Sequence, residues 1–213
     1  MRFLKNSLLI LAAAVWLSCS SDPPAPGSDG KMRVTVTTAQ IADLVKNVGG
    51  GRVAVTALMG PGVDPHLYKA SQGDIGRLAS ADIVFYNGLM LEGRMADILE
   101  RLIRGGRPAA SVALGEKIDP ALLSHPPQFQ GHSDPHIWMD VSLWARTIPA
   151  VIQELAALDP AGREEYEKNG EAYRQALERL HEEVKQKIQT IPKERRVLIT
   201  AHDAFGYFGR AYD

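Results

Sequence analysis

The sequence contains a single cysteine, Cys19, among 213 residues. One cysteine excludes a framework of intramolecular disulfides and also a zinc site built from several thiolates. If this chain binds a metal ion, the ligands must therefore be histidine and carboxylate side chains.

An excess of charge of one sign is also missing. The chain has 24 lysine and arginine residues and 25 acidic residues, which gives a formal net charge of −1. Such a balance offers no electrostatic footprint for nucleic acid and no polybasic patch for anionic lipid, so we expect no nucleic-acid partner. No HExxH or GxSxG motif commits the chain to a hydrolytic reaction.

The amino end has the layout of an export signal. Arg2 and Lys5 precede an uncharged apolar stretch over residues 7–17, which is too short to span a bilayer. Cys19 follows at once and resembles the acylated cysteine of bacterial lipoproteins, although Trp16 stands where leucine is usual. We predict a signal peptide at residues 1–18 and lipidation at Cys19, with plain secretion or a retained anchor as the alternatives.

A tract rich in Ser, Asp, Pro and Gly follows the cysteine. Residues 19–31 therefore read as a flexible, lipidated tether that holds a domain near a membrane. This predicts an exported protein, in the periplasm or on the outer face of the cytoplasmic membrane.

A short phrase occurs twice in the chain, as Asp64-Pro65-His66-Leu67-Tyr68 and as Asp134-Pro135-His136-Ile137-Trp138. Proline fixes its own φ and forces the preceding aspartate into extended geometry, so the direction of each imidazole is set locally. A third histidine, His202, directly follows an apolar run where a strand would end. The pattern favours convergence of His66, His136 and His202 into a metal site.

Strand and helix patterns alternate over the first two thirds of the chain. Apolar alternation and turn residues predict strands at residues 33–37, 53–59, 82–86, 109–114 and, after a long gap, 196–201. Helical spacing predicts helices at residues 41–48, 71–79, 90–103 and 141–158, the last interrupted near Pro149. Strands alternating with helices indicate a mostly parallel sheet, in which ligands sit beyond the carboxyl ends of the strands.

The charged stretch over residues 160–189 predicts one long helix that bridges two lobes. We therefore expect an α/β fold of two lobes with mostly parallel sheets flanked by helices. The predicted regions are an N-terminal lobe at residues 32–140, a helical region at 141–192 with the interlobe helix at about 160–190, and the start of a C-terminal lobe at 193–213. We expect this second lobe to be incomplete, in a truncated chain.

Three segments together carry a resemblance to a known family. GPGVDPHLY, DPHIWMD and TAHDAFGYFGRAY stand in order along the chain, and a lipoprotein signal precedes them. In these features the chain resembles the metal receptors of bacterial ABC importers, the cluster 9 or cluster A-I solute-binding family that captures zinc or manganese.

The resemblance implies roles for particular residues. His66 and His136 would be ligands from the first lobe, and His202 the first ligand from the second. The family's fourth ligand, an aspartate, matches no position here and is expected beyond Asp213. We do not propose Asp203 as this ligand. Three imidazoles favour Zn²⁺, with Mn²⁺ or dual carriage as the alternative. The expected partners are the divalent cation, a membrane permease and the membrane itself through the lipid anchor, and we expect a monomer.

The remaining polar candidates leave alternatives open. Asp64 and Asp134 either accept hydrogen bonds from the histidines that follow them or cap local turns. His125 and His132 lie in a Pro-rich loop and could help to capture metal, whereas His181 lies on the charged helix and is expected on a solvated face. We predict no enzyme, but a zinc-dependent hydrolase and a lipoprotein adhesin remain as alternatives.

Overall fold

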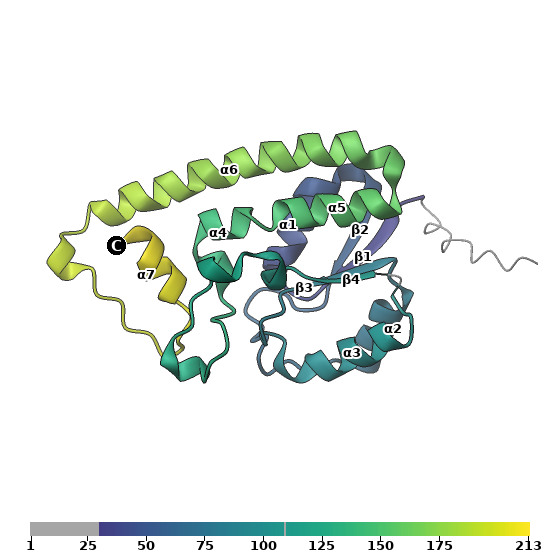
Figure 1. The fold of residues 1–213 in the computed structure, drawn as a ribbon, viewed down its shortest axis with the longest axis horizontal. Coiled ribbons are helices and arrows are strands. Elements are labelled where there is room, and N and C mark those ends of the chain that lie inside the picture. The colour runs from purple at the N-terminus through teal and green to yellow at the C-terminus, as the bar shows by residue number, and fades with distance from the viewer. Residues whose placement is uncertain (1–29, 109) are drawn as a thin grey trace, which may run out of the picture.

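A computed structural model describes residues 30–108 and 110–213. These residues contain one four-stranded sheet in the order β2-β1-β3-β4, with every pairing parallel (Figure 1). The strands are β1 (Met32–Val36), β2 (Val53–Ala57), β3 (Ile83–Tyr86) and β4 (Ala110–Ala113). The predicted parallel sheet is therefore confirmed, while the predicted signal peptide, Cys19 and most of the tether lie outside the described residues.

Helices cover both faces of this sheet. α1 (Ala39–Gly49) and α5 (Ile148–Leu158) pack on one face, and α2 (Gln72–Ser80) and α3 (Ala96–Arg104) cover the other (Figure 1). Successive side chains of a strand point to opposite faces, so Ile83 and Phe85 join the core beneath α1 while Val84 joins the core beneath α2 and α3. Both faces of the central strand β3 are buried, in keeping with its uninterrupted apolar sequence Ile83-Val84-Phe85.

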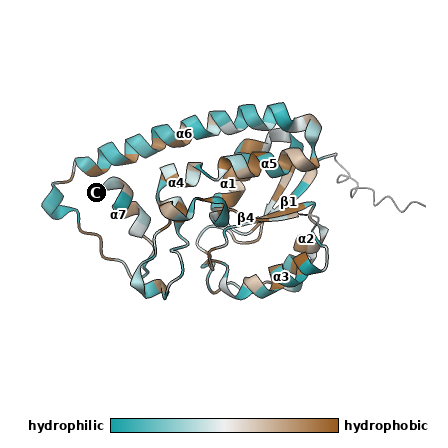
Figure 2. Ribbon diagram, in the orientation of Figure 1, coloured by the Kyte–Doolittle hydropathy of each residue, from teal (hydrophilic) through white to brown (hydrophobic). Residues whose placement is uncertain are grey.

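The predicted long helix is present as α6 (Arg163–Gln189), which contains 27 residues. At 1.5 Å per residue it is about 40 Å long. It contacts α1, α5, α4 (Val141–Ala145) and α7 (Gly206–Tyr212), and it is mostly hydrophilic along its length (Figure 2). None of the helices in the described part of the chain combines the length and apolar character needed to cross a membrane.

The strand predicted over residues 196–201 is wrong. After a 3-10 turn at Lys193–Arg195 the chain is irregular and pairs with no strand in the described residues. The side chains of Val197, Leu198 and Ile199 are 74%, 60% and 90% exposed. β-Branched, apolar residues favour extended backbone, but a strand also needs a neighbouring strand to satisfy its backbone groups.

The helix predicted from Met90 also begins later than expected. Leu89 and Met90 have φ angles of 51° and 66°, which a right-handed helix does not allow. A tight loop therefore precedes the 3-10 turn Gly93–Met95, and α3 begins only at Ala96. The interruption predicted near Pro149 is present. The segment 141–158 forms α4 and α5, with Pro149 in the first turn of α5, where its missing N–H costs nothing.

The close packing of α6 on α5 makes a testable prediction at Gly170. A Cβ atom at this position would lie 2.5 Å from Cδ1 and 3.2 Å from Cγ1 of Ile152, and 3.1 Å from Cγ2 of Ile148. We expect Gly170→Val to lower the free energy of unfolding by about 1–3 kcal/mol, because an overpacked interface must shift. Urea unfolding followed by circular dichroism measures the change.

The matched control is Gly209→Val in α7, where an added Cβ meets no atom within 4 Å. We expect this variant to change the free energy of unfolding by less than about 1 kcal/mol. Equal effects of the two substitutions would contradict the packing argument.

Candidate metal centre

Three histidine rings meet beside the carboxyl edge of the sheet. Nε2 of His136 lies 3.2 Å from Nε2 of His66 and 3.1 Å from Nε2 of His202. One nitrogen from each ring lies within 4.8 Å of the others, and this is the only group of its kind among the described residues. A tetrahedral Zn²⁺ with Zn–N distances of about 2.05 Å separates its nitrogen ligands by about 3.3 Å, so the spacing suits a shared cation.

The tautomer of His136 follows from its partner. Its Nδ1 lies 2.7 Å from Oδ1 of Asp134, and a carboxylate can only accept, so Nδ1 carries the proton. In the neutral ring, Nε2 then presents a lone pair toward the other two histidines. Without a cation, this one lone pair would have to accept hydrogen bonds from both neighbouring rings, and the donating nitrogens would then present no lone pair of their own. A cation accepts one lone pair from each of the three rings.

Burial differs among the three rings. His136 is buried, His66 is partly buried and His202 is exposed. Burial, and then the neighbouring rings of His136 and His202, lower the pKa of His66. The neutral form that binds a metal is therefore favoured at this position.

Both Asp-Pro-His phrases fold into the same local turn. Oδ1 of Asp64 accepts a hydrogen bond from the backbone N–H of His66 at 2.9 Å, and Asp134 does the same for His136 at 2.9 Å. Only Asp134 also contacts the ring of the following histidine. The sequence suggested the same alternatives for both aspartates, but Asp64 contacts only the backbone of its histidine whereas Asp134 contacts the backbone and the ring.

A buried carboxylate holds the loop that lies between the two histidine loops. Glu92 accepts hydrogen bonds from the hydroxyl of Thr37 at 2.8 Å and from the backbone N–H groups of Asn87 at 2.6 Å and Gly88 at 3.0 Å. Burial raises the pKa of Glu92, and these donors oppose that effect. The end of β1 and the loop after β3 are thereby tied together.

This loop supports both His66 and His136. The side-chain amide of Asn87 donates to the carbonyl oxygen of Pro135, the residue before His136, at 3.0 Å. On the other side, a Cβ at Gly93 would lie 2.6 Å from the carbonyl oxygen of His66, so only glycine allows this approach. Sequence reasoning missed Asn87, Glu92 and Gly93. The only signal in the sequence that could have indicated them is the occurrence of polar residues within an apolar segment directly after a strand.

The other histidines lie outside the cluster. His125 and His132 are exposed, and Nε2 of His125 lies 3.1 Å from the hydroxyl of Ser133. The expectation that His181 lies on a solvated face is wrong. Its side chain is 19% exposed, and Nδ1 lies 3.2 Å from the Tyr212 hydroxyl and 3.9 Å from Oδ1 of Asp140, because α7 covers this side of α6.

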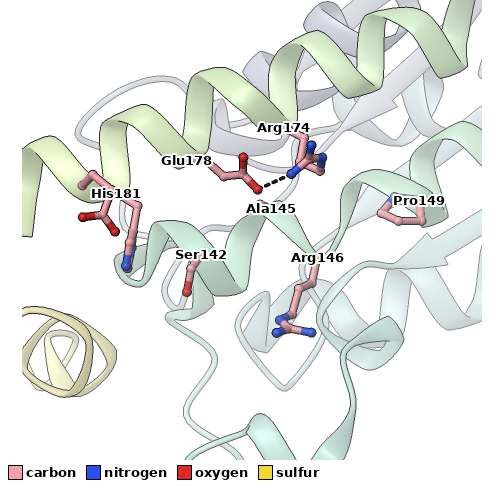
Figure 3. A pocket seen from close by; sticks show the side chains of 8 residues that line it. Ser142, Ala145, Arg146, Pro149, Arg174, Glu178 and His181 are labelled. Atoms are coloured by element: carbon pink, nitrogen blue, oxygen red, sulfur yellow. Dashed lines mark hydrogen bonds and ion pairs between the residues drawn. The ribbon is translucent and has the colours of Figure 1, made fainter.

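His181 also lines a groove of about 580 Å³ between α4 and α6, shown in Figure 3. Arg174 and Glu178 form an ion pair at its upper wall, and Ser142 and Arg146 line the α4 side. Glu178 and Glu182 also line the groove. Among the described residues, however, only His66, His136 and His202 bring three ligand atoms close enough to share a cation.

Comparison with known proteins places this geometry in context. Residues 34–213 match the family described as zinc-uptake complex component A, periplasmic. The manganese-binding lipoprotein MntA of Bacillus subtilis is 42% identical over 205 residues, covering 96% of this chain and 65% of the relative. The zinc-binding protein TroA of Treponema pallidum is 45% identical over 185 residues, covering 87% of this chain and 58% of the relative.

A solved structure, the periplasmic zinc-binding protein TroA from Treponema pallidum, superposes with a TM-score of 0.81 at 45% identity. It covers 86% of this chain, which matches 64% of that structure. The chain thus spans about three fifths of the length of these relatives. The match over residues 34–213, the identity to these relatives and the superposition of the fold show that the chain belongs to the family of periplasmic zinc-uptake component A proteins.

Proposed function

We propose that this chain captures a divalent transition metal outside the cytoplasm, zinc in the first place, and passes it to an ABC-type membrane permease. The observation that carries the proposal is the convergence of three Nε2 atoms at 3.1 and 3.2 Å around His136. The names of two relatives, a manganese-binding lipoprotein and a zinc-binding protein, support a receptor for such cations.

The proposed mechanism is capture and release without chemistry on a substrate. His66 and His136 come from loops at the sheet edge, whereas His202 comes from beyond α6. A cation bound by all three rings joins these two parts of the chain, and the stiff α6 limits how far they separate. The permease would release the metal by moving the two parts apart.

The metal would be zinc rather than manganese. Three imidazoles suit a four-coordinate Zn²⁺ site, and the exposed side at His202 leaves room for a fourth ligand, for which we propose an aspartate beyond Asp213. Manganese prefers more oxygen ligands. A manganese or dual receptor of the same type is the second candidate, favoured by the 42% identity to MntA.

Lipidation at Cys19 would hold this receptor at the outer face of the membrane, as a monomer tethered by the tract that follows. The lipoprotein name of the manganese-binding relative supports this part of the proposal. No observation in the described residues favours the zinc hydrolase or the adhesin, and we propose neither.

Removal of one imidazole tests the site. We expect His66→Ala to weaken Zn²⁺ binding by more than about 100-fold, because loss of a direct ligand exceeds the 10- to 100-fold cost of losing an outer partner. Competitive titration against a chromophoric chelator measures the dissociation constant. His132→Ala is the control, since this exposed histidine lies outside the cluster and its removal should leave the affinity unchanged. Equal Zn²⁺ affinity of His66→Ala and the unaltered chain would contradict the assignment of His66 as a ligand.

Protonation should compete with the metal. Binding needs neutral rings, so we expect zinc affinity to be steady above about pH 7 and to fall as pH decreases below the ordinary histidine pKa of about 6.5. The lowered pKa of His66 delays its own protonation to lower pH, so the loss should be gradual. Isothermal titration at about pH 7.5 and about pH 5.5 tests this. An affinity independent of pH would contradict imidazole ligation.

Direct competition separates the two metals. At equal free concentrations we expect Zn²⁺ to displace Mn²⁺, with an affinity higher by roughly tenfold or more, because nitrogen-rich sites follow the order of intrinsic metal affinities. Elemental analysis after dialysis against both metals gives the ratio bound. Preferential retention of Mn²⁺ would establish the second candidate instead.

A further inference from the structure

The exposed position of His202 raises the question of what holds it against the buried His136. The preceding residues do not, because Ile199 is 90% exposed and the residues around it pair with no strand in the described chain. The contacts of the loop itself are local or exposed, such as the hydroxyl of Thr200 donating to the carbonyl oxygen of His202 at 2.8 Å. The support must come from the residues that follow.

Tyr207, in the first turn of α7, is buried completely. Its hydroxyl donates a hydrogen bond to the carbonyl oxygen of Asp134 at 3.0 Å and accepts one from the backbone N–H of Ser124 at 3.0 Å. Burial raises the pKa of Tyr207, so its hydroxyl stays protonated and able to donate at neutral pH. These two bonds join α7 to the loop that carries His136.

The contacted residue is the one that orients His136. Oδ1 of Asp134 lies 2.7 Å from Nδ1 of His136, while a Cβ added at Gly206 would lie 3.2 Å from Oδ2 of the same aspartate. Gly206 and Tyr207 therefore rest on the backbone and the side chain of Asp134 together. His202 lies only four residues before Gly206, and Ala204 between them is buried, so the segment that joins His202 to this contact is short and partly fixed.

We propose that Tyr207 is a positioning residue that fixes His202 against His136 by anchoring the start of α7 to Asp134 and Ser124. The expected effect on metal affinity rests on the proposed function. The expected arrangement of the two rings also applies to the metal-free chain. Two hydrogen bonds to backbone groups set the geometry, and no new ligand is involved.

The test compares two tyrosines of the same helix. Tyr212 is also buried, and its hydroxyl accepts from the backbone N–H of Val141 at 3.2 Å and lies 3.2 Å from Nδ1 of His181, away from the histidine cluster. We expect Tyr207→Phe to weaken Zn²⁺ binding by about 10- to 100-fold and Tyr212→Phe to leave it unchanged. Equal losses would show a general effect of loosening α7 and would overturn the proposal.

A double-mutant cycle identifies the residue through which Tyr207 acts. In a His202→Ala background, Tyr207→Phe should cost less than about twofold in affinity, because the ring that it positions is already absent. The same fold-loss with and without His202 would mean that Tyr207 acts through Asp134 and His136 or through the fold, not through His202, and would overturn the proposal. Thermal unfolding of each variant confirms that the compared chains are folded.

Proton NMR of the metal-free chain provides a readout that needs no zinc. The ring centroids of His136 and His202 lie 5.0 Å apart, so cross-relaxation between their ring protons should be visible in the unaltered chain and in Tyr212→Phe. It should be lost in Tyr207→Phe, and its persistence there would overturn the proposal. A chain that binds no zinc but shows this dependence would refute the metal receptor while leaving the positioning role in place.

Discussion

Parallel pairing of four strands is the constraint on which the candidate centre depends. The carboxyl ends of parallel strands lie at one edge of the sheet, so the segments that follow β2, β3 and β4 all emerge at that edge. The segment after β2 carries His66, the segment after β3 carries Asn87, and the segment after β4 leads to His136. An antiparallel arrangement would send alternate segments to opposite edges, and the rings could not converge.

Polar contacts, beside the packing of the His136 ring against Trp138 and Phe129, hold the histidine loops in place at this edge. Glu92 is a buried carboxylate satisfied by one hydroxyl and two backbone N–H groups, a set of bonds that offsets the cost of removing it from water. Through Asn87 and Gly93 the same loop contacts the backbone at His66 and beside His136. Such a network restricts ring position more narrowly than exchangeable methyl contacts could.

The centre is built unequally from its two sides. His136 is buried and held by Asp134, whereas His202 is exposed and follows residues without a strand partner. α6 connects the two parts along its length, and α7 returns the chain to the loop that carries His136. This inequality suits a site in which one side is preformed and the other closes on the cation, with a small change of position rather than a wide hinge motion.

Local patterns in the sequence predicted the four paired strands, most of the helices and the three histidines that the structure brings together. Alternating apolar residues marked the four paired strands, and proline beside His66 and His136 marked two turns of the same kind, because φ restriction and side-chain periodicity act within a few residues. Local patterns failed where the outcome depends on a distant partner. Residues 196–201 have strand composition but no neighbouring strand among the described residues, and His181 is covered by α7.

The sequence by itself determined which residues could ligate a metal and the order in which strands and helices follow one another. Only the tertiary structure decided that three rings meet, that Asp134 contacts a ring while Asp64 does not, and that Asn87, Glu92 and Tyr207 support the loops. The physical reason is the reach of the interactions. A turn or a helix is specified by adjacent residues, whereas hydrogen bonds such as Asn87 to Pro135 and Tyr207 to Asp134 join residues 48 and 73 positions apart and leave no periodic trace in the chain.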